Sequence, residues 1–226
     1  MDWDAFFLTL KLDVVVCVIL LVIGIPVAYW IAFSRWRAKF LAEAILTLPL
    51  VLPPTVLGFY LLVALGPRSP LGRLWITLFG HPLAFTFGGL VLASVVYSLP
   101  FMVQPLASSF AGVDPRLLNA SASLGVERLA TFRRVVLPLS LPGLFTGLVL
   151  TFAHTLGEFG VVLMVGGNIP GVTRTVSVSI YDRVQALDFT SAGSTSLFLL
   201  VLSFLLLALV YGLNRGPRAL WPGHRS

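Results

Sequence analysis

The sequence predicts an all-α, polytopic membrane protein with about five transmembrane helices. Of its 226 residues, 58% are hydrophobic and only 11% are charged, whereas about a quarter of the residues in a typical soluble domain are charged. Side chains with so little charge cannot cover a water-facing surface, so lipid is the expected solvent. Five uncharged stretches each reach the roughly 20 helical residues that cross a bilayer. The length suits one domain over residues 1–226.

The predicted spans are spaced along the whole chain, at residues 14–33, 44–65, within 82–112, about 135–157, and 191–213. Prolines interrupt most of them, and the pair Pro53-Pro54 lies in the middle of the second. Proline removes a helical hydrogen bond and kinks the axis, which membrane helices tolerate where neighbours satisfy the freed carbonyls. The prolines therefore fit either ordinary kinking or helices that are shaped around a path.

The orientation follows from three segments that are rich in basic and poor in acidic residues. They are residues 34–40, residues 114–134 and the tail after residue 213. Cytoplasmic loops carry an excess of Lys and Arg, so we place all three segments in the cytoplasm. The net charge of +6 is then a property of membrane-flanking loops, and nucleic acid is not an expected partner. An odd number of spans places the N-terminus outside and the C-terminus inside. The basic residues of these segments are Arg35, Arg37, Lys39, Arg116, Arg128, Arg133, Arg134, Arg215, Arg218 and Arg225.

Residues 114–138 differ from the spans because they predict an amphipathic helix pair on the cytoplasmic side. Asp114 followed by Pro115 is typical of a helix start, with a capping side chain and a proline whose missing N–H costs nothing. Gly125 interrupts the helical spacing of apolar residues, as a helix end or a close backbone contact does. The pair could lie on lipid headgroups, or it could dock into a groove of a soluble partner.

A resemblance favours docking. The segment is similar to the EAA loop of bacterial ABC importer permeases, in which Glu-Ala-Ala is followed after three residues by Gly, and nine residues later by Ile, one residue and Leu-Pro. The resemblance implies a type I ABC importer permease fold and docking onto a cytoplasmic ATP-binding subunit, present in two copies. The chain departs from the pattern with Asn for Glu and Ser for the second Ala. The matching positions are Asn119, Ala120, Ser121, Gly125, Val135, Leu137 and Pro138.

A second resemblance concerns the substrate. Residues 156–160 (LGEFG), 167–171 (GNIPG), 173–175 (TRT) and 180–181 (IY) resemble the molybdate branch of these permeases. The resemblance implies import of molybdate, and of tungstate with it, through a bacterial-type cytoplasmic membrane, with an extracytoplasmic oxyanion-binding protein as partner. The sulfate/thiosulfate branch is the alternative, since it shares most of this pattern but tends to have Tyr after the Glu.

Two ionisable residues, His154 and Glu158, lie in the predicted spans, one helical turn apart on the same face. Ionisable groups at membrane depth are functional candidates. The pair could relay protons, but no further ligand supports a metal site. Glu158 could also accept backbone N–H groups where Gly157 and Gly160 break the helix, and so hold an outer gate in shape, or it could simply reach water. The residues predicted for the path or gate are Thr151, His154, Thr155, Glu158 and Phe159.

The outer loop after this span supplies the expected contacts with the binding protein, Asn168 and Arg174. Arg174 is also the cation that we expect an arriving anion to meet. The predicted spans themselves contain no Lys or Arg, so no fixed cation would hold a dianion inside the membrane. Tight binding there would oppose release, and selectivity is therefore expected mainly in the binding protein.

The leading hypothesis is a permease that performs no catalysis and needs no cofactor. ATP would be hydrolysed by a separate subunit, because the chain has no GxxxxGK[ST] phosphate loop. An intramembrane enzyme would need a paired nucleophile and base, and nothing in the sequence pairs Ser98 or Ser140 with His154. A proton-driven secondary transporter would usually show internal repeats, and none is evident. Five spans do not easily enclose a polar path alone, so a second copy of the chain is the simplest partner.

Overall fold

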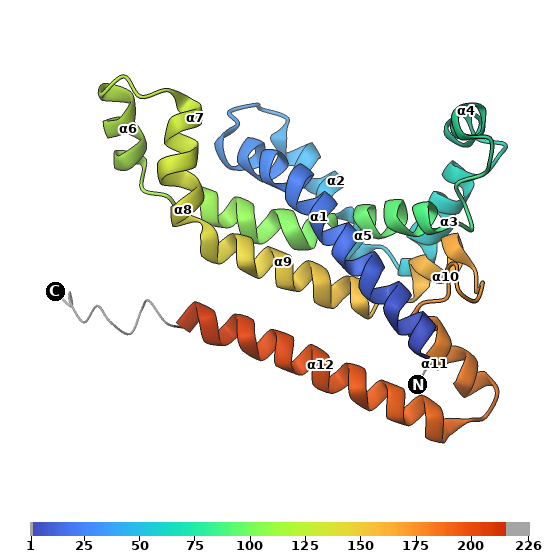
Figure 1. Cartoon of the computed structure of the whole chain (residues 1–226). Coiled ribbons are helices and arrows are strands. Elements are labelled where there is room, and N and C mark those ends of the chain that lie inside the picture. The colour runs from blue at the N-terminus through green and yellow to red at the C-terminus, as the bar shows by residue number, and fades with distance from the viewer. Residues whose placement is uncertain (1, 216–226) are drawn as a thin grey trace.

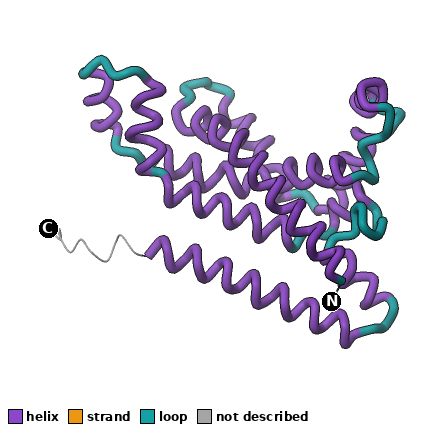
Figure 2. Tube along the Cα trace, viewed as in Figure 1, coloured by secondary structure: helices purple, strands orange, loops and turns teal. Residues whose placement is uncertain are grey.

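The structure is a computed structural model that describes residues 2–215, which fold into helices and connecting loops (Figures 1 and 2). Three helices within this range are long and apolar enough to cross a membrane, and two bent helix pairs raise the number to as many as five. The all-α prediction is confirmed. The helices are α1 (Trp3–Phe33), α2 (Lys39–Val51), α3 (Pro54–Leu65), α4 (Pro70–Phe79), α5 (Phe87–Ala111), α6 (Pro115–Ser123), α7 (Arg128–Thr131), the π-helix η1 (Phe132–Val136), α8 (Leu137–Leu139), α9 (Leu141–Leu156), α10 (Gly160–Gly166), α11 (Val176–Gln185) and α12 (Phe189–Arg215).

The second predicted span is broken in the middle. Helices α2 and α3 meet at an angle of 113°, with Leu52 and Pro53 between them. Proline has no N–H to donate and disfavours helical geometry in the residue before it, so the Pro53-Pro54 pair ends α2 and starts α3. The prolines therefore do more than kink an otherwise continuous helix. A second bend of 68° precedes α9, where Ser140 separates α8 from a helix whose second residue is Pro142.

The first span begins earlier than predicted. Helix α1 starts at Trp3, and the Asp2 carboxylate caps it by accepting a hydrogen bond from the Ala5 N–H at 3.1 Å. Lys11 and Asp13 therefore belong to a membrane-spanning helix. The prediction that His154 and Glu158 are the only ionisable groups in the spans is wrong. The prediction that the spans contain no Lys is wrong for the same reason. Asp13 is completely buried, and neither carboxylate oxygen has a hydrogen-bond partner within residues 2–215.

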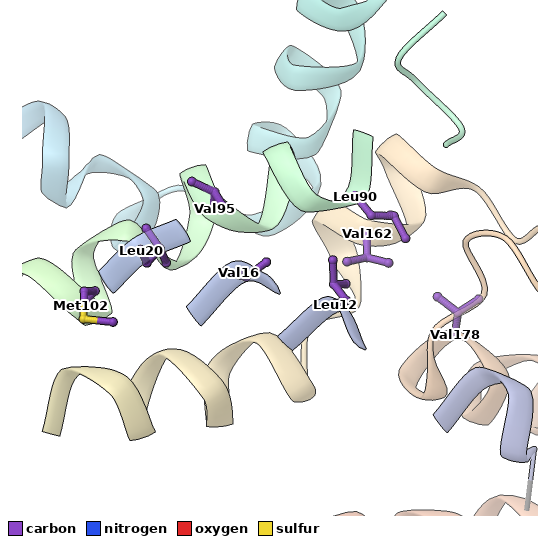
Figure 3. Close-up of a cluster of buried hydrophobic side chains, with 8 residues drawn as sticks. All are labelled: Leu12, Val16, Leu20, Leu90, Val95, Met102, Val162 and Val178. Atoms are coloured by element: carbon purple, nitrogen blue, oxygen red, sulfur yellow. The ribbon is translucent and has the colours of Figure 1, made fainter. Parts of the chain in front are cut away.

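The core forms where α1, α5 and α9 pack together. Leu12, Val16 and Leu20 follow one face of α1 at four-residue spacing and meet side chains of α5, α10 and α11 (Figure 3). One close approach of the three helices surrounds Met102 of α5. A Cβ added to Gly24 of α1 would lie 2.7 Å from Met102 Cγ, and one added to Gly147 of α9 would lie 2.9 Å from Met102 O. Small residues let membrane helices approach this closely.

Short helices fill the segments that were predicted as outer loops. Helix α4 lies between the second and third spans, and α10 and α11 lie between the fourth and fifth. Helix α10 packs closely on α3, because a Cβ on Gly160 would lie 2.7 Å from Pro54 Cβ, and one on Gly58 would lie 2.8 Å from Met164 Cβ. Figure 1 shows α4, α10 and α11 at one end of the molecule and α6 and α7 at the other, with α12 along the outside near α9 and α11.

Candidate functional site

The predicted helix pair of residues 114–138 is present at one end of the bundle. Asp114 caps α6 by accepting from the Arg116 N–H at 2.8 Å. At the other end of α6, Val126 N donates to Ser121 O at 3.1 Å and Gly125 N donates to Ala122 O at 3.0 Å. With Gly125 at φ +70°, these two bonds form a Schellman motif. The sequence prediction of a capped start and a glycine-ended helix is confirmed.

The two arms of this loop are tied to each other and to the spans. The Ser121 and Thr131 hydroxyls lie 2.6 Å apart and link α6 to α7. The Phe132 ring, in η1, makes edge contacts with Tyr29 of α1 at 5.2 Å and with Phe110 of α5 at 5.8 Å between centroids. Because of these ring contacts, a movement of the loop would displace side chains of α1 and α5 directly. The sequence alone does not identify Tyr29 and Phe110 as neighbours of Phe132.

The surface of the loop is apolar where it faces away from the bundle. Leu117 is 45% exposed, Leu124 80% and Leu129 51%. A cavity of about 510 Å³ lies between the loop and the end of α1, with Tyr29 and Arg35 in its lining. The residues predicted for coupling lie along both arms. On α6, Asn119 and Ala120 are exposed and Ser121 is half-buried; at the base, Val135 and Leu137 are half-buried and Pro138 is exposed.

The first two basic segments and the beginning of the third lie at this same end of the molecule. Figure 1 shows the connection between α1 and α2, the α6–α7 loop and the last turn of α12 there, while the start of α1 lies at the opposite end. A single side of the membrane for all three is therefore compatible with the fold. Arg218 and Arg225 of the basic tail lie outside the described residues.

Near the middle of the bundle, α5 and α9 bring together three polar side chains. The Ser98 hydroxyl lies 3.0 Å from His154 Nδ1 and 2.9 Å from the Thr155 hydroxyl. The His154 ring stacks on Phe101 at 4.0 Å and contacts Tyr97 at 4.6 Å. Nothing in the sequence pairs Ser98 with His154, because 56 residues separate them and only helix packing makes them neighbours.

The face of α5 that contacts His154 continues toward the end of the molecule where residues 114–138 lie. Tyr97, Phe101 and Gln104 follow one another at helical spacing, and Gln104 is exposed. A cavity of about 290 Å³ lies beside Gln104, with Glu43 and Thr47 of α2 in its lining. Exposing an amide to lipid within a span is expensive, so this face, together with His154, is the strongest candidate for lining a polar path.

The remaining residues predicted for the path are more enclosed. Thr151 is fully buried without a hydrogen-bond partner within residues 2–215, and Thr155 is 2% exposed. Helix α9 ends at Leu156 and α10 starts at Gly160, and in this break Glu158 accepts a hydrogen bond from the Val161 N–H at 2.8 Å. Glu158 is only 7% exposed. The Phe159 ring contacts Tyr181 at 5.1 Å. The backbone contact of Glu158 matches the expectation, while its role as a gate stays a prediction.

In the outer loop, Asn168 and Arg174 bind each other. Arg174 Nε donates to Asn168 Oδ1 at 2.7 Å, and Arg174 Nη2 lies 3.5 Å from Asp182 Oδ2 of α11. Asn168 Nδ2 also donates to both carboxylate oxygens of Asp182, at 2.8 and 2.6 Å. Asp182 therefore offsets the charge of Arg174 and fixes the loop on α11. Contact with a binding protein stays a prediction for both residues, and only part of their polar surface is available for it.

No group of three or more His, Cys, Asp or Glu side chains arranged to hold a metal ion occurs within residues 2–215. The site thus consists of an exposed apolar helix pair at one end and a polar face within the bundle. The two are connected mechanically through Phe132 and the α5 helix.

Comparison with known proteins gives concordant results. Residues 22–218 match the family model described as "Binding-protein-dependent transport system inner membrane component". The molybdenum transport system permease protein ModB of Azotobacter vinelandii is 50% identical, over 95% of both chains. The ModB protein of Escherichia coli (strain K12) is 40% identical, over 81% of this chain and 80% of the relative.

Solved structures of ABC transporters share the fold. A bacterial transporter involved in import of the acidic polysaccharide alginate aligns with a TM-score of 0.73 at 16% identity, covering 94% of this chain and 78% of that chain. The MetNI methionine transporter in an inward-facing conformation aligns with a TM-score of 0.74 at 17% identity, covering 95% of both.

Proposed function

This chain belongs to the family of binding-protein-dependent transport system inner membrane components, and from that membership we propose that it is the permease subunit of an ATP-driven molybdate importer. The observation that supports molybdate as the substrate is the 50% identity to a molybdenum permease along nearly the whole of both chains. The all-helical fold with up to five spans agrees with a permease, and tungstate is the natural second substrate because it is also a tetrahedral dianion.

The importer would be assembled from several chains. A cytoplasmic ATP-binding subunit, in two copies, would dock on the helix pair of residues 114–138, where Leu117, Leu124 and Leu129 are exposed although they are apolar. A second copy of this permease would complete the path along the polar face of α5 and α9. An extracytoplasmic oxyanion-binding protein would deliver the anion at the end that carries α4, α10 and α11. The permease itself would then hydrolyse no ATP and need no cofactor.

The substrate test is uptake by the complete complex in sealed vesicles, with molybdate and sulfate competing at equal low concentration. We expect molybdate uptake that excess tungstate inhibits and excess sulfate does not. Sulfate uptake that excess molybdate leaves unchanged would refute the molybdate assignment and favour the sulfate/thiosulfate alternative. Failure of ATP to drive uptake of any oxyanion would instead count against the importer itself.

We expect the N-terminus outside and the C-terminus in the cytoplasm, because the first two basic segments and the beginning of the third lie at one end of the bundle. Reporter fusions after Ser226 and near His81, just beyond α4, should report opposite sides of the membrane. The fusion near His81 avoids interrupting α4 itself. A cytoplasmic signal from both fusions would contradict the orientation.

Glu158→Gln should retain more transport than Glu158→Ala. The Gln side-chain oxygen can still accept from the Val161 N–H, whereas Ala leaves this buried donor unpaired, at a cost of about 1–3 kcal/mol. Uptake by matched amounts of reconstituted complex measures the difference. If Gln is as damaging as Ala, the charge itself matters and a proton relay through His154 and Glu158 regains support.

A further inference from the structure

In the Thr155–Ser98–His154 cluster, the number of hydroxyl hydrogens favours one set of hydrogen-bond directions. Each hydroxyl has one hydrogen to donate. Thr155 is 2% exposed and Ser98 is 1% exposed, and within residues 2–215 the Thr155 hydroxyl has no hydrogen-bond partner other than Ser98. If Thr155 donates to Ser98 and Ser98 donates to His154 Nδ1, both hydroxyl hydrogens are used.

The reverse arrangement leaves a defect. If His154 Nδ1–H donated to Ser98, Ser98 would donate to Thr155, and the Thr155 hydrogen would then have no acceptor in a buried position. A buried unpaired donor is costly, so the first arrangement is preferred. It requires Nδ1 to be an acceptor, which makes the imidazole neutral and places its one N–H at Nε2.

The surroundings fix the direction in which this N–H is presented. Phe101 stacks on the His154 ring, with 26° between the planes, and Tyr97 contacts the ring as well. The ring is only half-buried, and Nε2 has no hydrogen-bond partner within residues 2–215. Gln104 continues the same face of α5 and is exposed. Glu158, in the break after α9, accepts from the Val161 N–H.

We propose that His154, held as the Nε2–H form by the Thr155–Ser98 hydrogen-bond chain, donates that N–H to a tetrahedral oxyanion as it passes along the face of α5 and α9. Hydrogen bonds to an ionised oxygen are stronger than neutral ones, yet a neutral donor adds no fixed charge that would trap a dianion. Neither α5 nor α9 contains Lys or Arg, so a neutral donor is the recognition chemistry that this face offers. The identity of the anion rests on the proposed function, whereas the tautomer does not.

The tautomer can be measured without transport. The chain contains three histidines, so ¹⁵N NMR of histidine-labelled protein in lipid bilayers should resolve His154, assigned by loss of its signals in His154→Gln. We expect an unprotonated Nδ1 and a protonated Nε2. Ser98→Ala should abolish this preference. Ser94→Ala is the matched control, because Ser94 is an equally buried hydroxyl one turn earlier on α5 without a hydrogen-bond partner in the described residues. A protonated Nδ1 in the wild-type protein overturns the proposal.

Transport then tests the donor. His154→Phe retains a ring against Phe101 but removes the N–H, and should lower molybdate uptake about tenfold or more, the size expected for losing a hydrogen bond to a charged group. His154→Gln restores an N–H donor and should stay within about threefold of wild type. Equal losses in both variants, or wild-type uptake by His154→Phe, overturn the proposal. If the wild-type complex carries sulfate instead of molybdate, the assigned substrate fails, and the same pair of variants assayed with sulfate still decides the role of His154.

Discussion

Gly147→Leu should prevent the permease from reaching a stable folded state. Gly147 of α9 lies against Met102 of α5, and an added Cβ would lie 2.9 Å from Met102 O and 3.2 Å from Met102 Sδ. The carbonyl oxygen belongs to the backbone, so relief requires α5 and α9 to separate. Overpacking commonly costs about 1–3 kcal/mol, and here the loss extends to Met102 contacts with Gly24 on α1. The measurement is the amount of protein in the membrane and its thermal unfolding in detergent.

Gly193→Leu is the matched control for this prediction. Gly193 is also a glycine within a long membrane helix, α12, but nothing lies within 4 Å of a Cβ added there. It should accumulate and unfold much as the wild-type protein does. A Gly147→Leu variant that unfolds at the wild-type temperature would show that the α5–α9 contact is looser than the structure indicates.

Gly125→Trp should leave the protein inserted in the membrane but should stop ATP hydrolysis from driving uptake. Within residues 2–215, nothing lies within 4 Å of a Cβ at Gly125, so we expect the close backbone contact suggested by the sequence to be with a partner. The positive φ of +70° adds a strain of about 1–2 kcal/mol for a residue with a side chain. A bulky ring at the tip of the helix pair should therefore impair docking of the ATP-binding subunit. Co-purification of that subunit and ATP-driven uptake measure the effect.

Two controls separate docking from backbone strain. Gly125→Asn keeps a residue that tolerates the left-handed conformation and should retain most coupling. Gly80→Trp places the same ring at another open glycine with φ +76°, on the far end of the molecule, and should leave co-purification of the ATP-binding subunit unchanged. Normal uptake by Gly125→Trp would count heavily against docking at this loop.

The sequence predicted the spans because a segment that crosses lipid must be long and apolar. It predicted the ends of α6 because a helix cap depends only on residues that are neighbours in the sequence. The helix pair followed from Asp114, Pro115 and Gly125, and each adopts the expected role. The start of α1 was misplaced because Lys11 and Asp13 end the uncharged window, although tertiary packing buries Asp13 inside the helix bundle. Charge content alone does not reveal such burial.

Other features depend on contacts between helices that are far apart in the sequence. Helix α10 has seven residues, which is too short to show a periodic pattern or the length of a span. The Ser98–His154 contact exists only because α5 and α9 pack with one register out of many. The break at Pro53-Pro54 was visible in the sequence, but its angle depends on what α3 packs against. Candidate path residues such as Gln104 were missed because a single amide in an apolar run does not stand out until its exposure is known.

The break between α2 and α3 has a consequence for how the chain is made. At 1.5 Å per residue, helices of 13 and 12 residues are about 20 and 18 Å long, and neither reaches across about 30 Å of hydrocarbon. The surface that fits α3 is α10, where Gly160 meets Pro54, and the ribosome synthesises it much later. The backbone at the bend is tolerated in lipid only when protein covers it. We therefore expect the nascent α2–α3 segment to be fully covered only after α10 has been synthesised, and a chain that stops before Gly160 to be degraded faster than the full chain.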